Sequence, residues 1–438
     1  MGLYEVVFRQ TLYPLLLMII TPNVAVVLPY IIINRNSNLQ MILRNENMIE
    51  VVQNAWNLVK WRSFQYPIII VVLLLWAGFS CVGLGGEPYL GPKQMSGFRA
   101  EYFHSGFRFY VISMTLVVPL IAYFDMLPLY NNFVTFAAYL VVFGFLFSIF
   151  LYIKGKVAPS PGIFRSSGNP IFDFYWGTEL YPRVGEFLDL KQIIICRFGL
   201  FLWQLIILVA WKANFELYQA SYARGYINWA FTANVLLQSL YLAKFYYWED
   251  GYMSTIDIAF DHFGYYTAWG CIAFVPTFYT SPSLYLVRHS PITGFHIIKF
   301  LTTTMIGVSM LILNYITDYQ RQVVRKTDGK CEIWGKPAKI IRAVYHDEDN
   351  KPVQSLLLAS GFWSCARHMN YAFEIGLAFV WSATASFISP IPYFYVIFLT
   401  ILLVHRSLRD DHKCRLKYGK YWEEYCQLVP YRIFPFVF

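Results

Sequence analysis

Long apolar runs recur along the 438-residue chain and constrain its fold more than any other feature. A helix needs about 20 apolar residues to cross the roughly 30 Å hydrocarbon layer of a bilayer. In lipid the backbone N–H and C=O groups of a segment must be hydrogen-bonded within the protein, which favours helices. We therefore expect an all-α polytopic membrane protein with about ten transmembrane helices. The runs lie at 12–34, 67–85, 109–128, 131–153, 193–213, 227–247, 265–285, 294–316, 371–388 and 391–404.

The composition excludes a soluble protein of ordinary kind. Hydrophobic residues make up 57% of the chain and charged residues 14%, with a mean hydropathy of +0.44. That leaves too few charges to cover a water-exposed surface, so we expect the apolar surface to face a lipid bilayer. The formal net charge of +9 raises the question of nucleic acid. The basic residues lie in the connections between apolar runs, as the positive-inside rule expects, so we predict no nucleic-acid partner.

The basic residues also predict the orientation of the chain. The connections 154–192, 318–354 and 406–438 carry five, eight and seven Lys or Arg, whereas 35–66, 214–226 and 286–293 carry four, one and one. We therefore expect the C-terminal region to face the cytosol. The expected location is a multi-pass position in the endoplasmic reticulum membrane of a eukaryote or the cytoplasmic membrane of a bacterium. We interpret the first apolar run as a span and not as a cleavable signal.

The motifs of soluble metal and nucleotide sites are absent from the sequence. The seven cysteines, Cys81, Cys196, Cys271, Cys331, Cys365, Cys414 and Cys426, form no CxxC pair, so we expect reduced thiols and no metal site. The nearest glycine-rich candidate, Gly83-Leu84-Gly85-Gly86, ends an apolar run and leads into Pro88. A nucleotide, if one binds, is therefore not expected on a Rossmann unit.

Residues 318–354 predict a compact excursion from the membrane. Asp328-Gly329 is a turn signal, and polar residues continue to Asn350 and Lys351. No repeat of fixed period occurs, and we expect a single integral-membrane domain over 1–438.

Three groups of polar residues adjoin the later apolar runs. The first contains Arg367, His368, Asn370, Tyr371 and Glu374, with Trp363 nearby. Spacings of three and four predict one helical face for Arg367, Asn370, Tyr371 and Glu374. A set of side chains that extend to the membrane boundary is the structural alternative.

The second group lies in 405–432 and places Arg406 and Asp410 one helical turn apart, with Arg409, Tyr418 and Tyr425 following. Its structural alternative is an amphipathic tail anchored at the interface by aromatic residues.

The third group, at the start of an apolar run, comprises Asp257, Asp261, His262, Tyr265 and Tyr266. A carboxylate at membrane depth is costly unless it is paired, so it indicates a functional site or pairing with a neighbouring helix.

At these groups the chain resembles the sterol reductases, of the sterol 14-reductase and lamin B receptor type. LLLASGFWSCARHMNY is similar to the family pattern LLxSGxWGxxRHxNY, and the segment from His405 to Pro435 is similar to HRxxRDxxxCxxKYGxxWxxYCxxVPYRIxP. Within the family, TIDIAFDHFGYYTAWG, GTELYPRVGEFLDLK and RKTDGKCEIWG are most similar to the 7-dehydrocholesterol reductases, also called sterol delta-7 reductases. The resemblance covers 169–438, whereas 1–168 offers little to match.

Arg321 stands where the family usually has a Lys, which keeps the charge but changes the geometry. Two further departures from the family pattern bear on the sterol. Phe260 stands where a His usually precedes the acidic residue, and Phe373-Glu374 replaces a common Gly-Asp pair. These departures predict a sterol pocket that differs in detail.

The resemblance implies NADPH-dependent reduction of a sterol ring double bond, most similar to reduction of the delta-7 bond of 7-dehydrocholesterol-like sterols. Protonating a conjugated ring diene gives an allylic cation that can accept a hydride, which calls for a buried acid. Asp261 and Tyr266 are the candidate acids, with His262 and Tyr265 beside them, and their spacing does not separate the proton donor from a relay. The cofactor-binding positions that the resemblance implies are Arg321, Arg325, Leu358, Trp363, Asn370, Tyr371, Arg406, Asp410, Tyr418 and Tyr425.

Other functions remain open at this point. Sterol 14-reductase or 24(28)-reductase activity would use the same motifs, and a sterol-binding protein without catalysis would be expected to lose the cofactor residues. A transporter would be expected to place charges in broken helices at midplane with paired repeats. An isoprenylcysteine methyltransferase shares a similar C-terminal pattern, but the length and the sterol motifs oppose it.

Overall fold

The computed structural model of the chain describes residues 5–92, 94, 97–162, 164–186, 188–219, 227–291, 296–346 and 352–438. The described residues are mostly helical, as predicted. By length and composition, seven of their helices can cross a membrane. These are Val6–Asn34, Gln65–Val82, Gly106–Tyr123, Phe133–Val157, Leu190–Gln219, Ile297–Lys326 and Ile391–Tyr418. The all-α polytopic fold class is confirmed, but a count of ten spans is not.

The three remaining apolar runs, at 227–247, 265–285 and 371–388, are helical but are not among these seven helices. Helix α17 (Met369–Ala383) has 15 residues, fewer than the roughly 20 that cross a bilayer. The run at 265–285 is divided into α14 (Tyr265–Trp269), a π-helical segment η3 (Gly270–Tyr279) that contains Pro276, and α15 (Ser281–His289). Proline removes a backbone donor, which accounts for the irregular helix.

The chain divides into two compact units, Met1–Ile292 and Thr293–Phe438. The expectation of one continuous domain remains a prediction. The first unit contains η1 (Glu5–Leu12), α1 (Tyr13–Asn34), α2 (Leu39–Asn45), α3 (Met48–Asn57), α4 (Gln65–Val82), β1 (Pro88–Leu90), β2 (Glu101–Phe103), α5 (Gly106–Tyr123), α6 (Leu127–Asn131), α7 (Phe133–Val157), α8 (Pro170–Trp176), β3 (Arg183–Val184), β4 (Leu188–Asp189), α9 (Leu190–Gln192), η2 (Ile193–Gly199), α10 (Leu200–Gln219), α11 (Trp229–Tyr247), α12 (Glu249–Tyr252), α13 (Ile256–Ala259), α14, η3 and α15.

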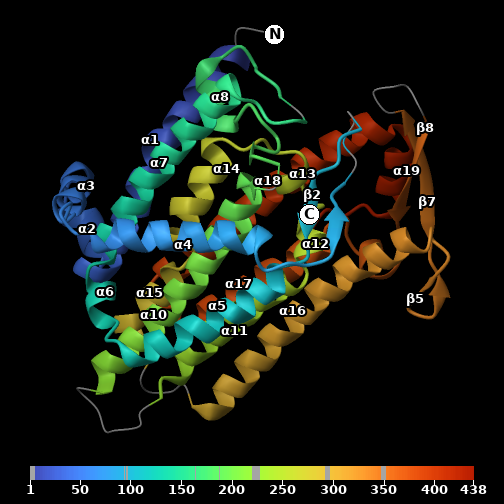
Figure 1. Cartoon of the computed structure of the whole chain (residues 1–438). Coiled ribbons are helices and arrows are strands. Elements are labelled where there is room, and N and C mark those ends of the chain that lie inside the picture. The colour runs from blue at the N-terminus through green and yellow to red at the C-terminus, as the bar shows by residue number, and fades with distance from the viewer. Residues whose placement is uncertain are drawn as a thin grey trace. The chain divides into compact units, whose positions relative to one another are not determined.

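Within the first unit, helices distant in sequence pack along one another. Helix α1 contacts α7, η3 and α15, and Figure 1 shows α1 and α7 running side by side. Helix α10 packs against α6, α11 and α15. The polar residues of α11 face the protein: Gln238 is buried and accepts a hydrogen bond from the Trp203 indole at 2.8 Å. Burial among protein partners explains how this less apolar helix is tolerated.

The second unit combines helices with two hairpins. Its elements are α16 (Ile297–Lys326), β5 (Glu332–Ile333), β6 (Lys336–Pro337), β7 (Ile340–His346), β8 (Pro352–Leu358), η4 (Gly361–Ser364), α17, η5 (Ile391–Tyr393), α18 (Phe394–Tyr418) and α19 (Lys420–Leu428). Helix α17 packs against both α16 and α18, and α19 packs against α18 and β7. In Figure 1 the long orange α16 and the β7–β8 hairpin are both visible.

The hairpins form the excursion that the sequence predicts after α16. Asp328 and Gly329 both have positive φ, 50° and 78°, as expected for this turn signal. Strands β7 and β8 pair antiparallel from Ile340 opposite Leu358 to His346 opposite Pro352. Asn350 and Lys351 lie outside the described residues. All sheets in the described part of the chain are two-stranded and antiparallel, which agrees with the expectation of no Rossmann unit.

Two helices extend further than their apolar runs. Helix α16 continues from the predicted end at 316 to Lys326, and α18 continues from 404 to Tyr418. The polar residues at these ends are therefore held on rigid helices that begin as apolar spans. The predicted separate tail at 406–438 begins only with α19.

Candidate functional site

The predicted acid, Asp261, lies in a short connection between α13 and α14 of the first unit. Its backbone N–H donates to the carbonyl of Ile256 at 3.0 Å, which closes the end of α13. The residue is 5% exposed. The fully buried Lys191 donates through Nζ to the backbone carbonyls of Ile258 (2.9 Å) and Asp261. An ammonium group from α9 (Leu190–Gln192) therefore contacts the segment that carries the predicted acid.

Two glycines let this segment approach the connection after α8. A Cβ at Gly264 would lie 2.3 Å from the nitrogen of Gly177, and a Cβ at Gly177 would lie 2.5 Å from the nitrogen of Gly264. Gly177 also has a φ of +96°, which side chains rarely adopt. The two backbones cross so closely that neither position has room for a side chain. The crossing holds residues 261–264 in one place.

His262 is attached to the same crossing. Its Nδ1 lies 3.0 Å from the carbonyl oxygen of Gly177. A carbonyl only accepts, so Nδ1 carries a proton and donates. Burial lowers the pKa of His262, and the charges of Lys191 and Arg165 act in the same direction. The imidazole is therefore neutral at neutral pH, and it orients the segment instead of contributing a charge.

The two predicted tyrosines enter a layer of aromatic rings. Tyr265 is 2% exposed, shares a 3.0 Å hydrogen bond with the Thr21 hydroxyl, and stacks on Trp269 at 5.1 Å. Tyr266 stacks on Trp176 with ring centroids 5.8 Å apart and an interplanar angle of 19°. Stacked aromatic rings in the segment that follows the buried Asp261 suit a flat apolar substrate.

In the second unit, α16 and α17 bring together several residues of the predicted cofactor set. The Asn314 amide donates to the backbone carbonyl of Asn370 at 2.9 Å, and the Asn370 amide donates to Asp318 at 3.1 Å. Asp318 also lies 3.8 Å from the Arg321 guanidinium. One polar chain therefore links α17 to Arg321.

The Trp363 ring supports Arg321. Its buried indole donates to the carbonyl of Thr317 at 2.7 Å, and the Arg321 guanidinium lies 4.8 Å from the ring centroid. Arg321 remains 40% exposed. Arg325, one turn later, is exposed. A cation stacked on a tryptophan face and a second cation one turn away form a suitable donor set for a phosphate group.

The structure corrects the prediction that Arg367 shares a helical face with Asn370, Tyr371 and Glu374. Helix α17 begins only at Met369. The backbone N–H groups of Arg367 and His368 donate instead to the carbonyls of Tyr431 (2.9 Å) and Arg432 (2.7 Å). Pairing with the C-terminal segment directs the Arg367 side chain away from the helix.

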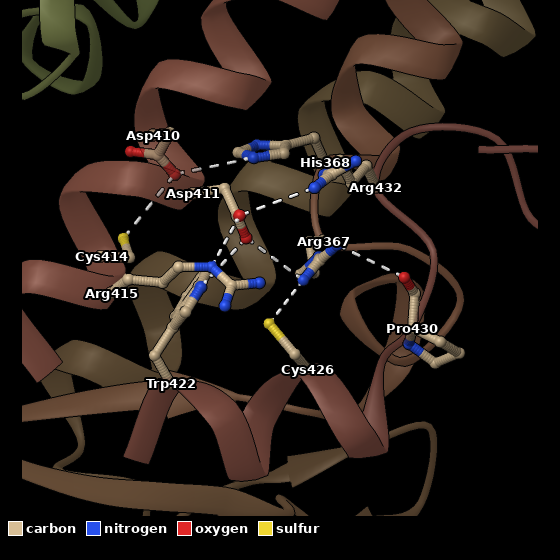
Figure 2. Close-up of polar contacts among 10 residues, drawn as sticks. All are labelled: Arg367, His368, Asp410, Asp411, Cys414, Arg415, Trp422, Cys426, Pro430 and Arg432. Atoms are coloured by element: carbon tan, nitrogen blue, oxygen red, sulfur yellow. Dashed lines mark hydrogen bonds and ion pairs between the residues drawn. The ribbon is translucent and has the colours of Figure 1, made fainter. Parts of the chain in front are cut away.

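Figure 2 shows the polar contacts of the Arg367 side chain. Its guanidinium contacts Asp411 at 3.4 Å, the Pro430 carbonyl at 3.3 Å and the sulfur of Cys426. Asp411 also accepts hydrogen bonds from Arg415 and Trp422, each at 3.1 Å, and lies 3.6 Å from Arg432. This network joins α18 to α19 and the C-terminal segment. Its role is to hold the polar end of the second unit together.

His368 and Asp410 form the neighbouring contact in Figure 2. The His368 Nε2 lies 3.6 Å from an Asp410 carboxylate oxygen, and its ring stacks on Tyr371 with centroids 4.8 Å apart. Burial lowers the pKa of His368 to about 4, an effect that Arg321, Arg367 and Arg406 reinforce and Asp410 opposes. Because three guanidinium groups lower the pKa of His368 and one carboxylate raises it, the surroundings of this imidazole carry an excess of positive charge.

The remaining predicted cofactor residues lie around these contacts. The Arg406 guanidinium lies 5.9 Å from the Tyr371 ring, and the Tyr418 hydroxyl lies 3.2 Å from that of Ser355. Leu358 packs in a buried cluster with Val324 and Trp363. Tyr425 is buried with Trp422 and other apolar residues. Within the described residues, no group of three or more His, Cys, Asp or Glu could hold a metal ion.

Four contributors to these sites were missed by sequence reasoning. Asp318 precedes Arg321 by one helical turn, and Asp411 follows Asp410 directly, so spacing could have indicated both. Lys191 and Gly177 are separated from Asp261 by many residues, and only their position at the two ends of the motif GTELYPRVGEFLDLK singled out their region. Their partners could not be known without the tertiary structure.

Comparisons with known proteins agree with the motifs. A model of the ergosterol biosynthesis ERG4/ERG24 family matches residues 8–438. The match therefore extends through the N-terminal helices, where the sequence motifs showed little resemblance.

Individual relatives carry sterol reductase names. A 7-dehydrocholesterol reductase of Arabidopsis thaliana is 38% identical over 400 residues, covering 90% of this chain and 89% of the relative. A 7-dehydrocholesterol reductase of Danio rerio is 37% identical over 303 residues, covering 68% and 61%. A Delta(14)-sterol reductase of Methylotuvimicrobium alcaliphilum is 33% identical over 361 residues, covering 81% and 78%.

Proposed function

Because the chain belongs to the ERG4/ERG24 family of sterol reductases, we propose that it reduces the delta-7 double bond of a 7-dehydrocholesterol-like sterol with NADPH. The relatives named 7-dehydrocholesterol reductase and the motifs around Asp261 support the delta-7 bond as the target. As a membrane protein with several apolar spans, it is proposed to receive its sterol from the lipid bilayer. The endoplasmic reticulum membrane of a eukaryote or the cytoplasmic membrane of a bacterium is the proposed location.

The observation that carries this proposal is the burial of Asp261 in the segment that continues into the stacked rings of Tyr265 and Tyr266. An isolated alkene does not accept a hydride, but a protonated conjugated diene is an allylic cation that does. The proton must come from an acid kept away from water, because water would compete for the cation. Asp261 and Tyr266 are the proposed acids, and the assignment of donor and relay between them stays open.

Neutral His262 and buried Tyr265 have positioning roles in this proposal. His262 binds the Gly177 carbonyl, and Tyr265 is held by Thr21 and Trp269. Neither group has to change its protonation state for the diene to be protonated. Both fix the orientation of the segment that carries the acids.

The second unit is the proposed cofactor unit. Arg321 and Arg325 fit the adenosine phosphate of NADPH, since guanidinium groups match phosphate oxygens in geometry and charge. Trp363 supports Arg321, and the Asn370, Tyr371, Arg406, Asp410 and Tyr418 side chains surround the same polar end of the unit. Leu358 and Tyr425 are buried in two apolar clusters of the same unit. When bound, NADPH supplies the hydride.

Reduction of the delta-14 bond is the second candidate. It is favoured by the Delta(14)-sterol reductase relative, which this chain matches over 81% of its own length. The same acid and cofactor residues would serve either bond. The two activities differ only in how the sterol ring system lies against the acid.

The test is expression in yeast cells that accumulate both delta-7 and delta-14 unsaturated sterols, followed by mass spectrometry of the sterol fraction. We expect the delta-7 bond to disappear and the delta-14 bond to persist. The matched control is Asp261→Asn, which should accumulate to the same level in the membrane and leave both sterols in place. If the wild-type chain reduces only the delta-14 bond, the second candidate replaces the first. If it consumes neither sterol, both are wrong.

A further inference from the structure

Lys191 is a buried cation for which neither the sequence motifs nor the proposed reaction provides a role. Its side chain is 1% exposed. It follows Asp189, whose carboxylate caps the turn by accepting from the backbone N–H groups of Lys191 (2.9 Å) and Gln192 (3.0 Å). The cap fixes the backbone from which the lysine side chain extends.

The ammonium group ends on the segment that carries the proposed acid. It donates to the carbonyl of Ile258, within α13, and to the carbonyl of Asp261, two residues after that helix ends. The last carbonyls of a helix lack intrahelical partners and carry partial negative charge, so a cation there is favourable. Lys191 therefore sets where the backbone of residues 258–261 lies.

The titratable groups around Lys191 come from several elements. Asp189 precedes α9, Asp257 belongs to α13, Asp261 follows it, and Cys271 belongs to η3. The Tyr181 ring lies 5.9 Å from the ammonium nitrogen. Burying an ammonium group is strongly unfavourable unless such partners compensate it. An apolar residue would fill this space without that cost.

We propose that Lys191 is the positioning residue of the acid: it holds residues 258–261 in place and, through its charge, controls the pH at which the Asp261 carboxyl can donate a proton. This inference rests on the proposed role of Asp261. A neighbouring cation stabilises an ionised carboxylate and so eases release of the proton to the diene. Without the cation the carboxyl stays protonated to higher pH but transfers its proton less readily.

The test compares purified wild-type protein with Lys191→Met, which keeps the length of the side chain and removes its charge. We expect kcat for the sterol to fall at least about tenfold and the sterol KM to change less than about threefold. The pH above which kcat falls should move upward, because ionisation of the carboxyl loses a favourable neighbour. Lys212→Met is the control, since Lys212 lies on α10 and pairs with Glu216, one helical turn away, at 3.4 Å. It should leave kcat and the pH profile unchanged.

A double-mutant cycle separates positioning from general stability. If Lys191 acts through Asp261, adding Lys191→Met to Asp261→Asn should lower kcat no further. A purely structural lysine would cause the same loss in both backgrounds and leave the pH profile in place, and either result would overturn the proposal. If Lys191→Met does not fold, Lys191→Arg carries the test: it keeps the charge, so the pH limb should stay near that of wild type while kcat falls. A pH limb that moved upward in that charge-keeping variant would overturn the proposal.

Failure of this inference can be told apart from failure of the proposed function. Loss of sterol reduction by the wild-type chain would remove the proposed function. Normal turnover by Asp261→Asn would remove the acid assignment. An active wild type, a slow Asp261→Asn and a normal Lys191→Met would reject the role of Lys191 alone.

Discussion

At the scale of single residues, two of the cations of the proposed cofactor set, Arg321 and Arg325, lie near the end of α16. Arg321 is stacked on Trp363, and Arg325 follows one turn later. Cations near a helix C-terminus also interact favourably with the helix dipole, which is the structural explanation for both. A phosphate site and a purely structural role differ in what the loss of both cations does to cofactor binding.

We predict that Arg321→Ala combined with Arg325→Ala weakens NADPH binding at least about tenfold more than NADH binding, because only NADPH carries the adenosine phosphate. Dissociation constants for both cofactors, measured by fluorescence titration of the detergent-solubilised protein, provide the comparison. Lys299→Ala, at the opposite end of the same helix, should affect neither. An equal loss for the two cofactors would contradict a phosphate site here.

His368 offers a prediction about pH. Its pKa is lowered to about 4 in the folded protein and is near 6.5 in an unfolded chain. The unfolded state therefore binds more protons between these values, so this contribution to stability is complete above pH 6.5 and is lost as the pH falls toward 4. The shift corresponds to at most about 3 kcal/mol.

The measurement is the free energy of unfolding between pH 7 and pH 4.5. We predict that His368→Gln loses less stability over this interval than the wild type, because glutamine does not titrate. His412→Gln is the control, since His412 is exposed on the same polar end of α18. Identical slopes for His368→Gln and the wild type would show that the imidazole is not held neutral.

At the scale of elements, the crossing of the α8–β3 connection with the α13–α14 connection holds the acid. We predict that Gly264→Ala destabilises the first unit by about 1–3 kcal/mol, because its Cβ would meet backbone atoms of Gly177 and Trp176 that cannot move aside. Sterol reduction should fall with it, since the Asp261 segment is displaced.

Gly270→Ala is the matched control for this prediction. Gly270 lies six residues later in η3, and a Cβ there would meet nothing within 4 Å. Alanine is also the better helix former, so stability should be unchanged or slightly raised. Thermal unfolding of the three proteins in one detergent decides the question. Equal melting temperatures for the two alanine variants would mean that the crossing can relax.

At the scale of the whole molecule, the proposed acid and the proposed cofactor residues belong to different compact units. The second unit carries 17 Lys and Arg against 11 Asp and Glu, so it holds most of the net positive charge of the chain. This division suits a neutral sterol for one unit and an anionic cofactor for the other. It also implies that binding of the two can be impaired separately.

We predict that Arg406→Ala and Asp410→Ala abolish turnover and weaken NADPH binding, while membrane insertion and sterol binding survive. Asp261→Asn should instead keep the binding of both NADPH and sterol. It should reduce the sterol at least about tenfold more slowly, which is roughly 1.4 kcal/mol of barrier. Membrane fractionation, binding of a radiolabelled sterol and single-turnover reduction test both statements. Near-normal reduction by either of these two α18 variants at saturating NADPH would leave α18 with a purely structural role.

Apolar run length and motif pattern were sufficient to predict the membrane fold class, the helical runs and the family. These properties are encoded locally, because a helix in lipid is specified by the hydrophobicity of its own residues. The Asp328-Gly329 turn belongs to the same category, since its φ values follow from the residues themselves. Sequence also placed Asp261, His262, Tyr265 and Tyr266 together, because they are consecutive or nearly so.

Only the tertiary structure decided which polar groups meet. Lys191 reaches carbonyls about 70 residues away, Gly177 crosses Gly264, and Arg367 leaves its expected helical face for Asp411 and Pro430. The end of α17 at Ala383 and the continuation of α18 to Tyr418 likewise depend on neighbours. Buried charges and crossing backbones are stabilised by partners distant in sequence, and no local pattern specifies those partners. For this reason the chemistry of the candidate acid was visible in the sequence, whereas the lysine that positions it was not.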